Sequence, residues 1–494
     1  MSNPMLNTDG YKLDHRRQYP AGTEYVYSNW TPRGSRVKGV NEVIFLGLQY
    51  AIKERLEKDF NENFFARPKE EVVGEYHEML AAYLGPDPAD TIGVEHIAEL
   101  HDLGYLPLEF KALPEGTRVP LRVPMFTVEN THPDFFWLVN YFETILSTTL
   151  WMPSTSATNA MHIRELLNEW AEKTGAPAEG VGFQGHDFSM RGMSGLEAAC
   201  LSAAGHLVAF TGTETVPVLH WIKKYYAPKD ENHFLAGTVP ATEHSVMCAG
   251  GMESERETFE RLLNLYPTGI LSVVSDTWDF WGVLTKHLPA LHDKIMARDG
   301  KLVIRPDSGD PADIICGTVG FYDGNRSFLT PPEKGAIEML WDEFGGTVND
   351  KGYKVLDSHI GLIYGDSMNF TRINDICRRL ENKGFSIEPL VFGLGSYGYQ
   401  YQTRDTFGFA MKATNVTING VETPIFKDPK TDDGLKKSLK GRIGVVRTQH
   451  GIVAIDQLPG KTTDKGDDLL QTVWKDGKFV REWGFDEVRA NAAN

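Results

Sequence analysis

The sequence has few cysteines, and they lie far apart. They are Cys200, Cys248, Cys316 and Cys377, and no two of them form a C-x-x-C pair. A disulfide framework or a zinc ribbon needs cysteines at short, regular spacings, so neither matches this pattern. We therefore expect a protein of a reducing compartment, the cytoplasm.

Basic residues are also in deficit. The chain has 50 Lys and Arg against 67 Asp and Glu, which gives a formal net charge of −17. Proteins that bind nucleic acid or acidic membranes need an excess of positive charge, so we expect neither partner. An anionic substrate would instead need a local cluster of cations within this acidic protein.

Long apolar runs are missing as well. The first residues, MSNPMLNTDGYK, have no basic and no apolar region, so we expect no signal peptide. The most apolar long stretch, 135–152, contains Asn140 and Glu143 and only just reaches the length of a membrane span. We predict a buried core helix there, started by Asp134 after Pro133, and no membrane partner.

The middle of the chain repeats one pattern, in which a short apolar run ends in a polar tip and a helix follows. Helical stripes lie between these runs, for example Ile373, Ile376, Cys377 and Leu380 before a stop at Gly384. This alternation is typical of a parallel sheet covered by helices on both faces. The runs are 270–276, 301–311, 359–367 and 388–396.

The flanks of the chain differ from its middle, because they contain many short strand-like runs and turns, such as 414–420 and 441–448. A chain of 494 residues is too long for one ordinary core. We predict an α/β protein with an irregular (β/α) barrel-like domain over residues 151–390. Residues 1–150 together with 391–494 would form a mixed α+β domain built from both chain ends.

Four aspartates follow the apolar runs: Asp276, Asp279, Asp307 and Asp366. Such strand ends are where α/β barrels place their chemistry, and carboxylates bind ribose hydroxyls or Mg²⁺. The alternative for each is an ordinary helix cap. In the segment 305–311 (RPDSGDP), Arg305 and the backbone N–H groups freed by the turn would also suit a polyanion.

Three further segments carry reactive side chains. Phe188 and Arg191, in 186–195 (HDFSMRGMSG), suit a flat heteroaromatic ring and a polar or phosphate group, although a buried turn explains them too. Glu214 lies between hydroxyls in 211–215 (TGTET). His244, between Glu243 and Ser245, suits acid–base or phosphoryl chemistry.

The sequence 393–398 (GLGSYG) matches the glycine spacing of a dinucleotide-binding loop. That motif also needs a helix opening at the last glycine and an acidic residue about twenty positions on. The following residues, 399–414, are aromatic and strand-like. We therefore favour a glycine-rich phosphate loop, with Arg404 directly behind it.

With these segments in hand, the chain closely resembles the nicotinamide phosphoribosyltransferases. The matching motifs run in one order from TDGYK (8–12) through HDFSMRG, GTET, PATEHS, VVSDTWD, IRPDSGDP, YGDS and QTRD to FKDP (426–429). The resemblance implies a type II phosphoribosyltransferase, a pentosyltransferase that makes nicotinamide mononucleotide from nicotinamide and phosphoribosyl pyrophosphate for NAD salvage. It also implies a homodimer whose active sites lie at the subunit interface.

The resemblance assigns roles to the substrate-binding residues. Phe188 and the partner subunit's Tyr11 would enclose the pyridine ring, and Arg305 and Glu214 would meet the carboxamide. The ribose would be bound by a group of strand-end residues: Asp307, Asp366 and Gly365, with Asp276 and Asp279 nearby.

It also assigns roles to the phosphate-binding residues. His244 matches the histidine that ATP phosphorylates, with Mg²⁺ held mainly by substrate phosphates and water, so its protein ligands stay unknown. The 5-phosphate would meet Arg191, Gly395, Ser396 and the partner subunit's Arg404. The cations for pyrophosphate or ATP would be Arg33, Lys412 and Lys427.

Two positions depart from the family pattern. The family usually has Asp where this chain has Glu214, and its glycine loop is richer than GLGSYG. A carboxylate accepts a hydrogen bond from a carboxamide but repels nicotinate, so Glu214 opposes the nearest rival hypothesis, a nicotinate phosphoribosyltransferase. Two further hypotheses are a non-catalytic nucleotide-binding or signalling protein on the same scaffold and an unrelated Mg²⁺-dependent barrel enzyme.

Overall fold

The computed structural model describes residues 3–320, 328–431, 438–458 and 468–494. The chain divides into two compact units. Unit 1 comprises Met1–Thr158, His220–His233 and Gln402–Asn494, and unit 2 comprises Asn159–Leu219 and Phe234–Tyr401. The sequence predicts domain boundaries at residues 150 and 390. It does not predict that residues 220–233 belong to unit 1.

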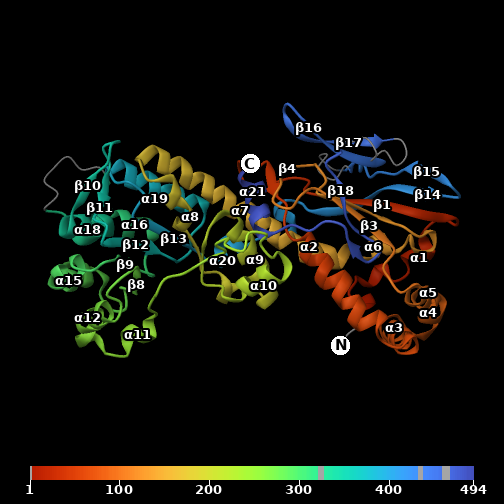
Figure 1. Cartoon of the computed structure of the whole chain (residues 1–494), viewed down its shortest axis with the longest axis horizontal. Helices are drawn as coiled ribbons and strands as arrows, with labels where there is room; N and C mark the ends of the chain where they lie inside the picture. The colour runs from red at the N-terminus through yellow and green to blue at the C-terminus, as the bar shows by residue number, and fades with distance from the viewer. Residues whose placement is uncertain (1–2, 321–327, 432–437, 459–467) are drawn as a thin grey trace. The chain divides into compact units, whose positions relative to one another are not determined.

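Unit 2 is built on a six-stranded parallel sheet in the order β7-β6-β13-β12-β9-β8, of which Figure 1 labels β8, β9, β12 and β13. Its strands are almost wholly buried, because helices cover the outer face of the sheet and the curled sheet itself encloses the inner face. The four predicted apolar runs are confirmed as β8, β9, β12 and β13. The strands are β6 (Gly185–Asp187), β7 (Gly212–Thr213), β8 (Leu271–Val274), β9 (Leu302–Arg305), β12 (Ile360–Tyr364) and β13 (Leu390–Leu394).

The segment 237–242 links the two edges of this curled sheet. Gly237 forms a parallel bridge to Gly212 of β7, and Ala241 forms one to Ser272 of β8. The Ser272 N–H donates to the Pro240 carbonyl at 2.9 Å, and the Thr242 N–H donates to the Ser272 carbonyl at 3.0 Å. The predicted irregular barrel-like fold is confirmed, and these isolated bridges are its irregular part.

The helices of unit 2 follow the predicted stripes. In α19 (Phe370–Asn382) the side chains of Ile373, Ile376, Cys377 and Leu380 are all buried, and the helix ends just before Gly384, whose φ is +76°. Other helices of the unit include α8 (Val181–Gln184), α9 (Leu196–Ala209), α11 (His244–Cys248), α12 (Glu255–Leu265), α13 (Phe280–Gly282), α14 (Leu288–Ala290), α15 (His292–Met296), α16 (Pro311–Cys316), α17 (Pro331–Lys334), α18 (Ala336–Phe344) and α20 (Ser396–Tyr399). A small hairpin adds β10 (Gly346–Val348) and β11 (Lys354–Leu356).

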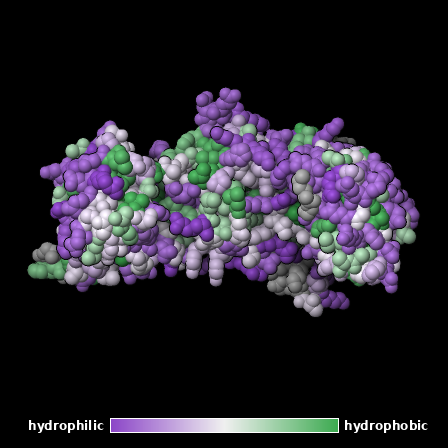
Figure 2. Space-filling model, turned by 90° about the horizontal axis from the view of Figure 1, so that it is seen from below, coloured by the Kyte–Doolittle hydropathy of each residue, from purple (hydrophilic) through white to green (hydrophobic). Residues whose placement is uncertain are grey.

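The apolar stretch 135–152 is buried as predicted, but the single helix starting at Asp134 is wrong. The stretch forms a 3₁₀ turn, then α6 (Leu138–Tyr141), then α7 (Glu143–Thr174). Polar groups inside it take tertiary partners, since Tyr141 Oη donates to the Met5 carbonyl and Asn140 accepts from Ser28. No described helix is long and apolar enough to cross a membrane. The face drawn in Figure 2 is largely hydrophilic, with hydrophobic residues in separate groups.

Unit 1 contains a seven-stranded sheet in the order β15-β14-β1-β5-β3-β18-β19. Strand β1 (Thr23–Thr31) lies antiparallel between β5 (Phe126–Asn130) and β14 (Ala410–Ile418), so both chain ends build one sheet. Its other strands are β3 (Leu108–Ala112), β15 (Val421–Pro424), β18 (Gln471–Lys475) and β19 (Lys478–Phe479). Smaller pairs are β2 (Glu42–Ile44) with β4 (Arg118–Pro120) and β16 (Arg442–Thr448) with β17 (Gly451–Leu458). The helices include α1 (His15–Gln18), α2 (Leu48–Ala51), α3 (Lys69–Leu84), α4 (Pro86–Ile92), α5 (Glu95–Leu103), the part of α10 (Pro217–Tyr225) that begins at His220, and α21 (Phe485–Ala493).

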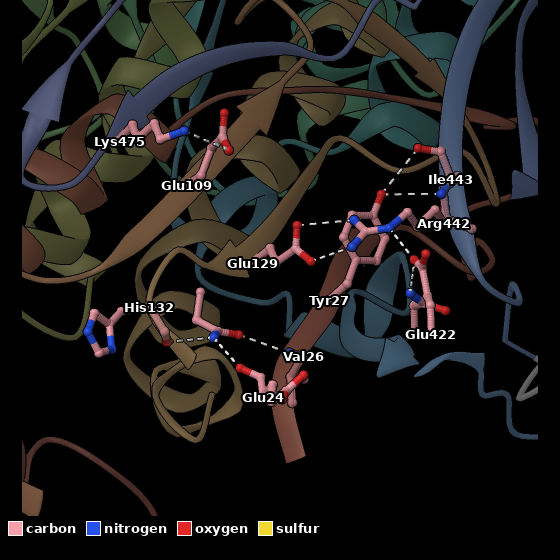
Figure 3. A network of polar contacts seen from close by, with 12 residues as sticks. Glu24, Val26, Tyr27, Glu109, Glu129, His132, Glu422, Arg442, Ile443 and Lys475 are labelled. Carbon is pink, nitrogen blue, oxygen red and sulfur yellow. Dashed lines mark hydrogen bonds and ion pairs between the residues drawn. The ribbon is translucent and has the colours of Figure 1, made fainter. Parts of the chain in front are cut away.

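The side chain of Arg442 contacts residues of several strands of unit 1 (Figure 3). Arg442, whose side chain is 10% exposed, binds both carboxylate oxygens of Glu129 and one of Glu422. Its guanidinium also lies 5.1 Å from the centre of the Tyr27 ring. Because these partners belong to β5, β15 and β1, the guanidinium connects three strands of the sheet to β16.

Candidate active site

Phe188 lies in a slot made by glycines at the ends of two neighbouring strands. Its N–H donates to the Leu394 carbonyl at 2.9 Å, directly after β6. A Cβ at Gly365 would lie 2.8 Å from the Phe188 ring, and one at Gly393 would lie 2.5 Å from it. Both glycines are therefore needed for the ring to take this position, where it is partly exposed.

The Phe188 ring borders a cavity of about 350 Å³ inside the curled sheet. The cavity is lined mainly by apolar groups with a few polar side chains, which is typical of a small-molecule site. A larger hollow beside α16 and α19, of about 720 Å³, is lined by none of the predicted site residues. The predicted or polar residues that line the smaller cavity include His186, Phe188, Glu214, Thr238, Ser272, Lys301 and Arg305.

Glu214 stands at this cavity on the end of β7. Its Oε1 accepts a hydrogen bond from His186 Nε2 at 2.9 Å and another from Thr238 Oγ1 at 2.5 Å. The hydrogen bond from His186 is the main cause that holds the pKa of Glu214 below its usual value, with Thr238 and Arg305 adding to it against the effect of burial. Glu214 is therefore an ionised carboxylate beside an aromatic ring.

A buried carboxylate to which the sequence assigned no separate role supports this edge of the site. Asp187 accepts hydrogen bonds from Ser189, from Thr213 Oγ1 at 2.8 Å and from Thr215 Oγ1 at 2.7 Å. Its full burial is stable because these donors satisfy both oxygens. In the sequence, the hydroxyls of Thr213 and Thr215, two residues apart, were the feature that could have indicated a buried acceptor nearby.

Arg305 and Asp307 lie together at the end of β9. Arg305 Nη2 donates to the Thr242 carbonyl at 2.8 Å, and its Nε lies 3.5 Å from Asp307 Oδ2. Burial raises the pKa of the Asp307 carboxyl, and the negative charges of Asp276 and Asp366 raise it further, against the lowering effect of Arg305 and His244.

The predicted acidic tips have different surroundings. Asp276 accepts from the Asp307 N–H at 3.0 Å and lies 3.3 Å from Nε2 of His244, which begins α11. Asp366 accepts from Ser367 Oγ at 3.0 Å, whereas Asp279 caps α13 by accepting from the Gly282 N–H. Among the residues described, no three His, Cys, Asp or Glu side chains form a group that could hold a metal ion.

The glycine-rich loop lies next to Arg191. A Cβ at Gly192 would lie 2.5 Å from Ser396 Oγ, so the two segments pack closely. Ser396 starts α20, which has only four residues, and the Gly398 N–H donates to the Gly395 carbonyl. A dinucleotide-binding loop opens a longer helix, so this loop is of another kind.

The remaining predicted residues belong to unit 1. Tyr11 is 63% exposed, and Arg404 is exposed beside Asp405. Burial lowers the pKa of Lys412, and so do the nearby charges of Arg33, Lys427 and Lys12. Lys12, to which the sequence assigned no role, also belongs to this group. Its Nζ forms a 2.9 Å ion pair with Glu143, and Glu143 lies 3.7 Å from Lys412. The position of Lys12 directly after Tyr11 in the sequence could have pointed to it. Unit 1 thus carries a local cluster of cations within an acidic protein.

Comparison with known proteins decides between these hypotheses. Residues 3–110 match the model of the nicotinamide phosphoribosyltransferase N-terminal domain, and residues 183–478 match that of the nicotinate phosphoribosyltransferase family. The nicotinamide phosphoribosyltransferase of Acinetobacter baylyi is 49% identical over 99% of this chain and 97% of its own length. The chain belongs to the nicotinamide phosphoribosyltransferase family. The enzyme of that name from Xanthomonas campestris is 33% identical over 100% of this chain and 98% of its own.

Solved structures share the fold of this nicotinamide phosphoribosyltransferase family member. Nicotinate-nucleotide pyrophosphorylase from Pyrococcus furiosus aligns with a TM-score of 0.55 at 16% identity, over 99% of this chain and 95% of that one. Human nicotinic acid phosphoribosyltransferase gives the same TM-score and identity over 99% and 93%. Membership of an enzyme family excludes the unrelated barrel enzyme and leaves the hypothesis of a non-catalytic protein without support.

Proposed function

We propose that this chain transfers the 5-phosphoribosyl group of phosphoribosyl pyrophosphate to nicotinamide, forming nicotinamide mononucleotide and pyrophosphate for NAD salvage. One observation carries the choice of nicotinamide: an ionised carboxylate, Glu214, stands at the cavity beside the Phe188 ring. Such a group accepts a hydrogen bond from a carboxamide and repels a carboxylate. The relatives that carry this name support the same substrate.

The pyridine ring stacks on Phe188, whose own ring is held in place against Gly365 and Gly393. Glu214 accepts from the carboxamide N–H₂, and Arg305 donates to the carboxamide oxygen. This orientation aims the ring nitrogen at the anomeric carbon of the ribose. The new nitrogen–carbon bond forms as the bond from that carbon to pyrophosphate breaks, so positioning and charge stabilisation supply the catalysis.

The ribose and the leaving group face the acidic strand ends. Asp307 and Asp366 accept hydrogen bonds from the ribose hydroxyls, and Asp276 and Asp279 follow the neighbouring strand β8. Mg²⁺ would neutralise part of the pyrophosphate charge when bound, and the strand-end carboxylates would be suited to contact its waters. This chain's own part is to orient the ribose and to place cations around the phosphates.

The phosphates require cations. Arg191, Gly395 and Ser396 form the cradle for the 5-phosphate, joined by Arg404 of the partner subunit. Arg33, Lys412 and Lys427 serve pyrophosphate or ATP. We propose a cytoplasmic homodimer with shared sites, and the 63% exposure of Tyr11, a large aromatic, supports its use as the second face of the ring slot by another subunit.

His244 is the residue proposed to couple ATP to the reaction. Its side chain is 50% exposed, and its Nε2 lies 3.3 Å from Asp276, which orients the ring. Attack by a ring nitrogen on the γ-phosphorus of ATP forms a phosphohistidine and releases ADP. Water later hydrolyses the phosphohistidine to inorganic phosphate. The negative charge added at His244 would help to position the phosphates and any Mg²⁺ bound with them.

Replacement of His244 by Ala is expected to abolish the stimulation of turnover by ATP while basal turnover remains. The reason is that the phosphoryl acceptor is lost, whereas Phe188, Glu214 and Arg305, which bind the pyridine, all remain. Steady-state rates with and without ATP measure the effect. Unchanged stimulation in the variant would show that ATP acts elsewhere.

The proposed reaction is tested by a matched assay. Purified protein, Mg²⁺ and phosphoribosyl pyrophosphate receive either nicotinamide or nicotinate, each with and without ATP, and mononucleotide is quantified by chromatography. A strong preference for nicotinamide is expected. A preference for nicotinate would keep the chemistry but overturn the role of Glu214, and no product from either would reject the proposed function.

The acidic limb of the pH–rate profile is expected to lie above the range of an ordinary aspartate. The raised pKa of Asp307 means that its carboxylate, the form that accepts from a ribose hydroxyl, is lost at a higher pH as the solution is acidified. Replacing Asp276 by Asn removes a neighbouring negative charge, so the limb should move to lower pH. Profiles of kcat/KM for phosphoribosyl pyrophosphate measure this, and an unmoved limb would assign the titration to another group.

A further inference from the structure

We infer that Thr238 is a positioning residue which, together with His186, fixes the carboxylate of Glu214 and thereby sets the preference for a carboxamide over a carboxylate on the pyridine ring. The inference rests on the proposed function. It concerns a residue that the sequence did not single out, placed at the cavity beside Glu214.

Both donors bind the same oxygen of Glu214. Thr238 Oγ1 lies 2.5 Å from Oε1, and His186 Nε2 lies 2.9 Å from it. Within the described part of the chain, the other oxygen, Oε2, accepts no hydrogen bond. The arrangement therefore holds one oxygen and leaves the second as the acceptor for a ligand N–H₂ in the cavity.

This restraint matters because Glu214 is long and its side chain is 43% exposed. A glutamate has three rotatable side-chain bonds, so without its donors the carboxylate would spread over several positions, most of them farther from the ligand. Coulomb repulsion falls with distance, so a mobile carboxylate rejects nicotinate less effectively. The hydrogen bonds from His186 and Thr238 also favour the ionised form that performs the rejection.

Thr238 belongs to the segment 237–242 that links the edges of the sheet. The Thr213 N–H donates to the Gly237 carbonyl, which anchors the start of this segment beside Glu214. At its other end, the Thr242 carbonyl accepts from Arg305 Nη2 at 2.8 Å. One segment thus positions both groups that meet the carboxamide, the acceptor Glu214 and the donor Arg305.

The test compares Thr238→Val, which keeps the shape but removes the hydroxyl, with Thr238→Ser, which keeps the hydroxyl. Allowing a unit charge to move from about 4 Å to about 6 Å, at an effective dielectric of about 20, weakens the discrimination about tenfold. We expect the valine variant to lose about this factor in the ratio of kcat/KM for nicotinamide over nicotinate. The loss should lie mainly in KM, and the serine variant should keep the parental ratio. An unchanged ratio in a folded valine variant would overturn the inference.

Two further measurements separate positioning from a general structural role. In the valine variant the acidic limb of the selectivity should move to higher pH, since Glu214 loses a donor that lowers its pKa. In a Glu214→Gln background the valine substitution should change the ratio no further, because the two residues act through one carboxylate. Additive effects would contradict the inference.

Failure of the proposed function gives a different result. If the parental protein forms no mononucleotide from either pyridine, the transferase reaction itself is rejected. Isothermal titration calorimetry of nicotinamide and nicotinate then still measures the selectivity of the cavity. A ratio of dissociation constants that Thr238→Val lowers and Thr238→Ser retains supports the inference, and equal ratios in all three proteins reject it.

Discussion

Replacing Glu214 by Gln is expected to lower the preference for nicotinamide over nicotinate by about a thousandfold. Two unit charges about 4 Å apart at an effective dielectric of about 20 repel each other by about 4 kcal/mol, and this term disappears with the charge. The lowered pKa of Glu214 means that the charge is present at neutral pH in the parental protein. Values of kcat/KM for both substrates measure the change.

Glu214→Asp is the matched control for this prediction. It keeps the charge and restores the residue that the family usually has, so the preference should survive. It also shortens the side chain, which weakens the contacts with His186 and Thr238. A glutamine variant that stays within tenfold of the parental ratio would show that another group filters the substrate.

Replacing Arg442 by Met is expected to lower the free energy of unfolding of unit 1 by about 3 kcal/mol or more. The side chain is 10% exposed and binds Glu129, which is 14% exposed, and Glu422. Without the guanidinium, two carboxylates remain close together in the sheet with no cation between them. Urea unfolding at equilibrium, followed by tryptophan fluorescence, measures the loss.

Lys475→Met provides the control in the same sheet (Figure 3). The ion pair of Lys475 with Glu109 is 3.5 Å long, and the lysine side chain is 47% exposed. Exposed pairs of this kind contribute about 0–1 kcal/mol because water screens them. If Arg442→Met cost no more than this control, the network would not hold the strands of unit 1 together.

The sequence predicted the strands of unit 2 more closely than the helix near residue 140. The four apolar runs became β8, β9, β12 and β13, because strands buried on both faces must be continuously apolar. The break between α6 and α7 was not predicted, since an apolar run does not show where polar groups such as the Tyr141 hydroxyl take tertiary partners. The segment 237–242 carries Gly and Pro and has no strand pattern, so its pairing with both β7 and β8 was not predicted.

For the candidate site as well, some features were predicted from the sequence and others only from the structure. Residue types and their order named Phe188, Glu214, Arg305 and Asp307, because aromatic, charged and strand-end residues have recognisable chemistry. The sequence alone does not distinguish an aspartate that caps a helix from one that faces a ligand. Only the structure therefore showed that Asp279 caps α13.

By itself, the sequence determined the alternation of strands and helices, the chemistry available at the strand ends and the resemblance to a family. Only the tertiary structure decided which side chains meet. One oxygen of Glu214 accepts hydrogen bonds from both His186, 28 positions earlier, and Thr238, 24 positions later. Such a pairing depends on strand order and register, which the backbone hydrogen bonds of the whole sheet fix together, and no local stretch of residues contains that information.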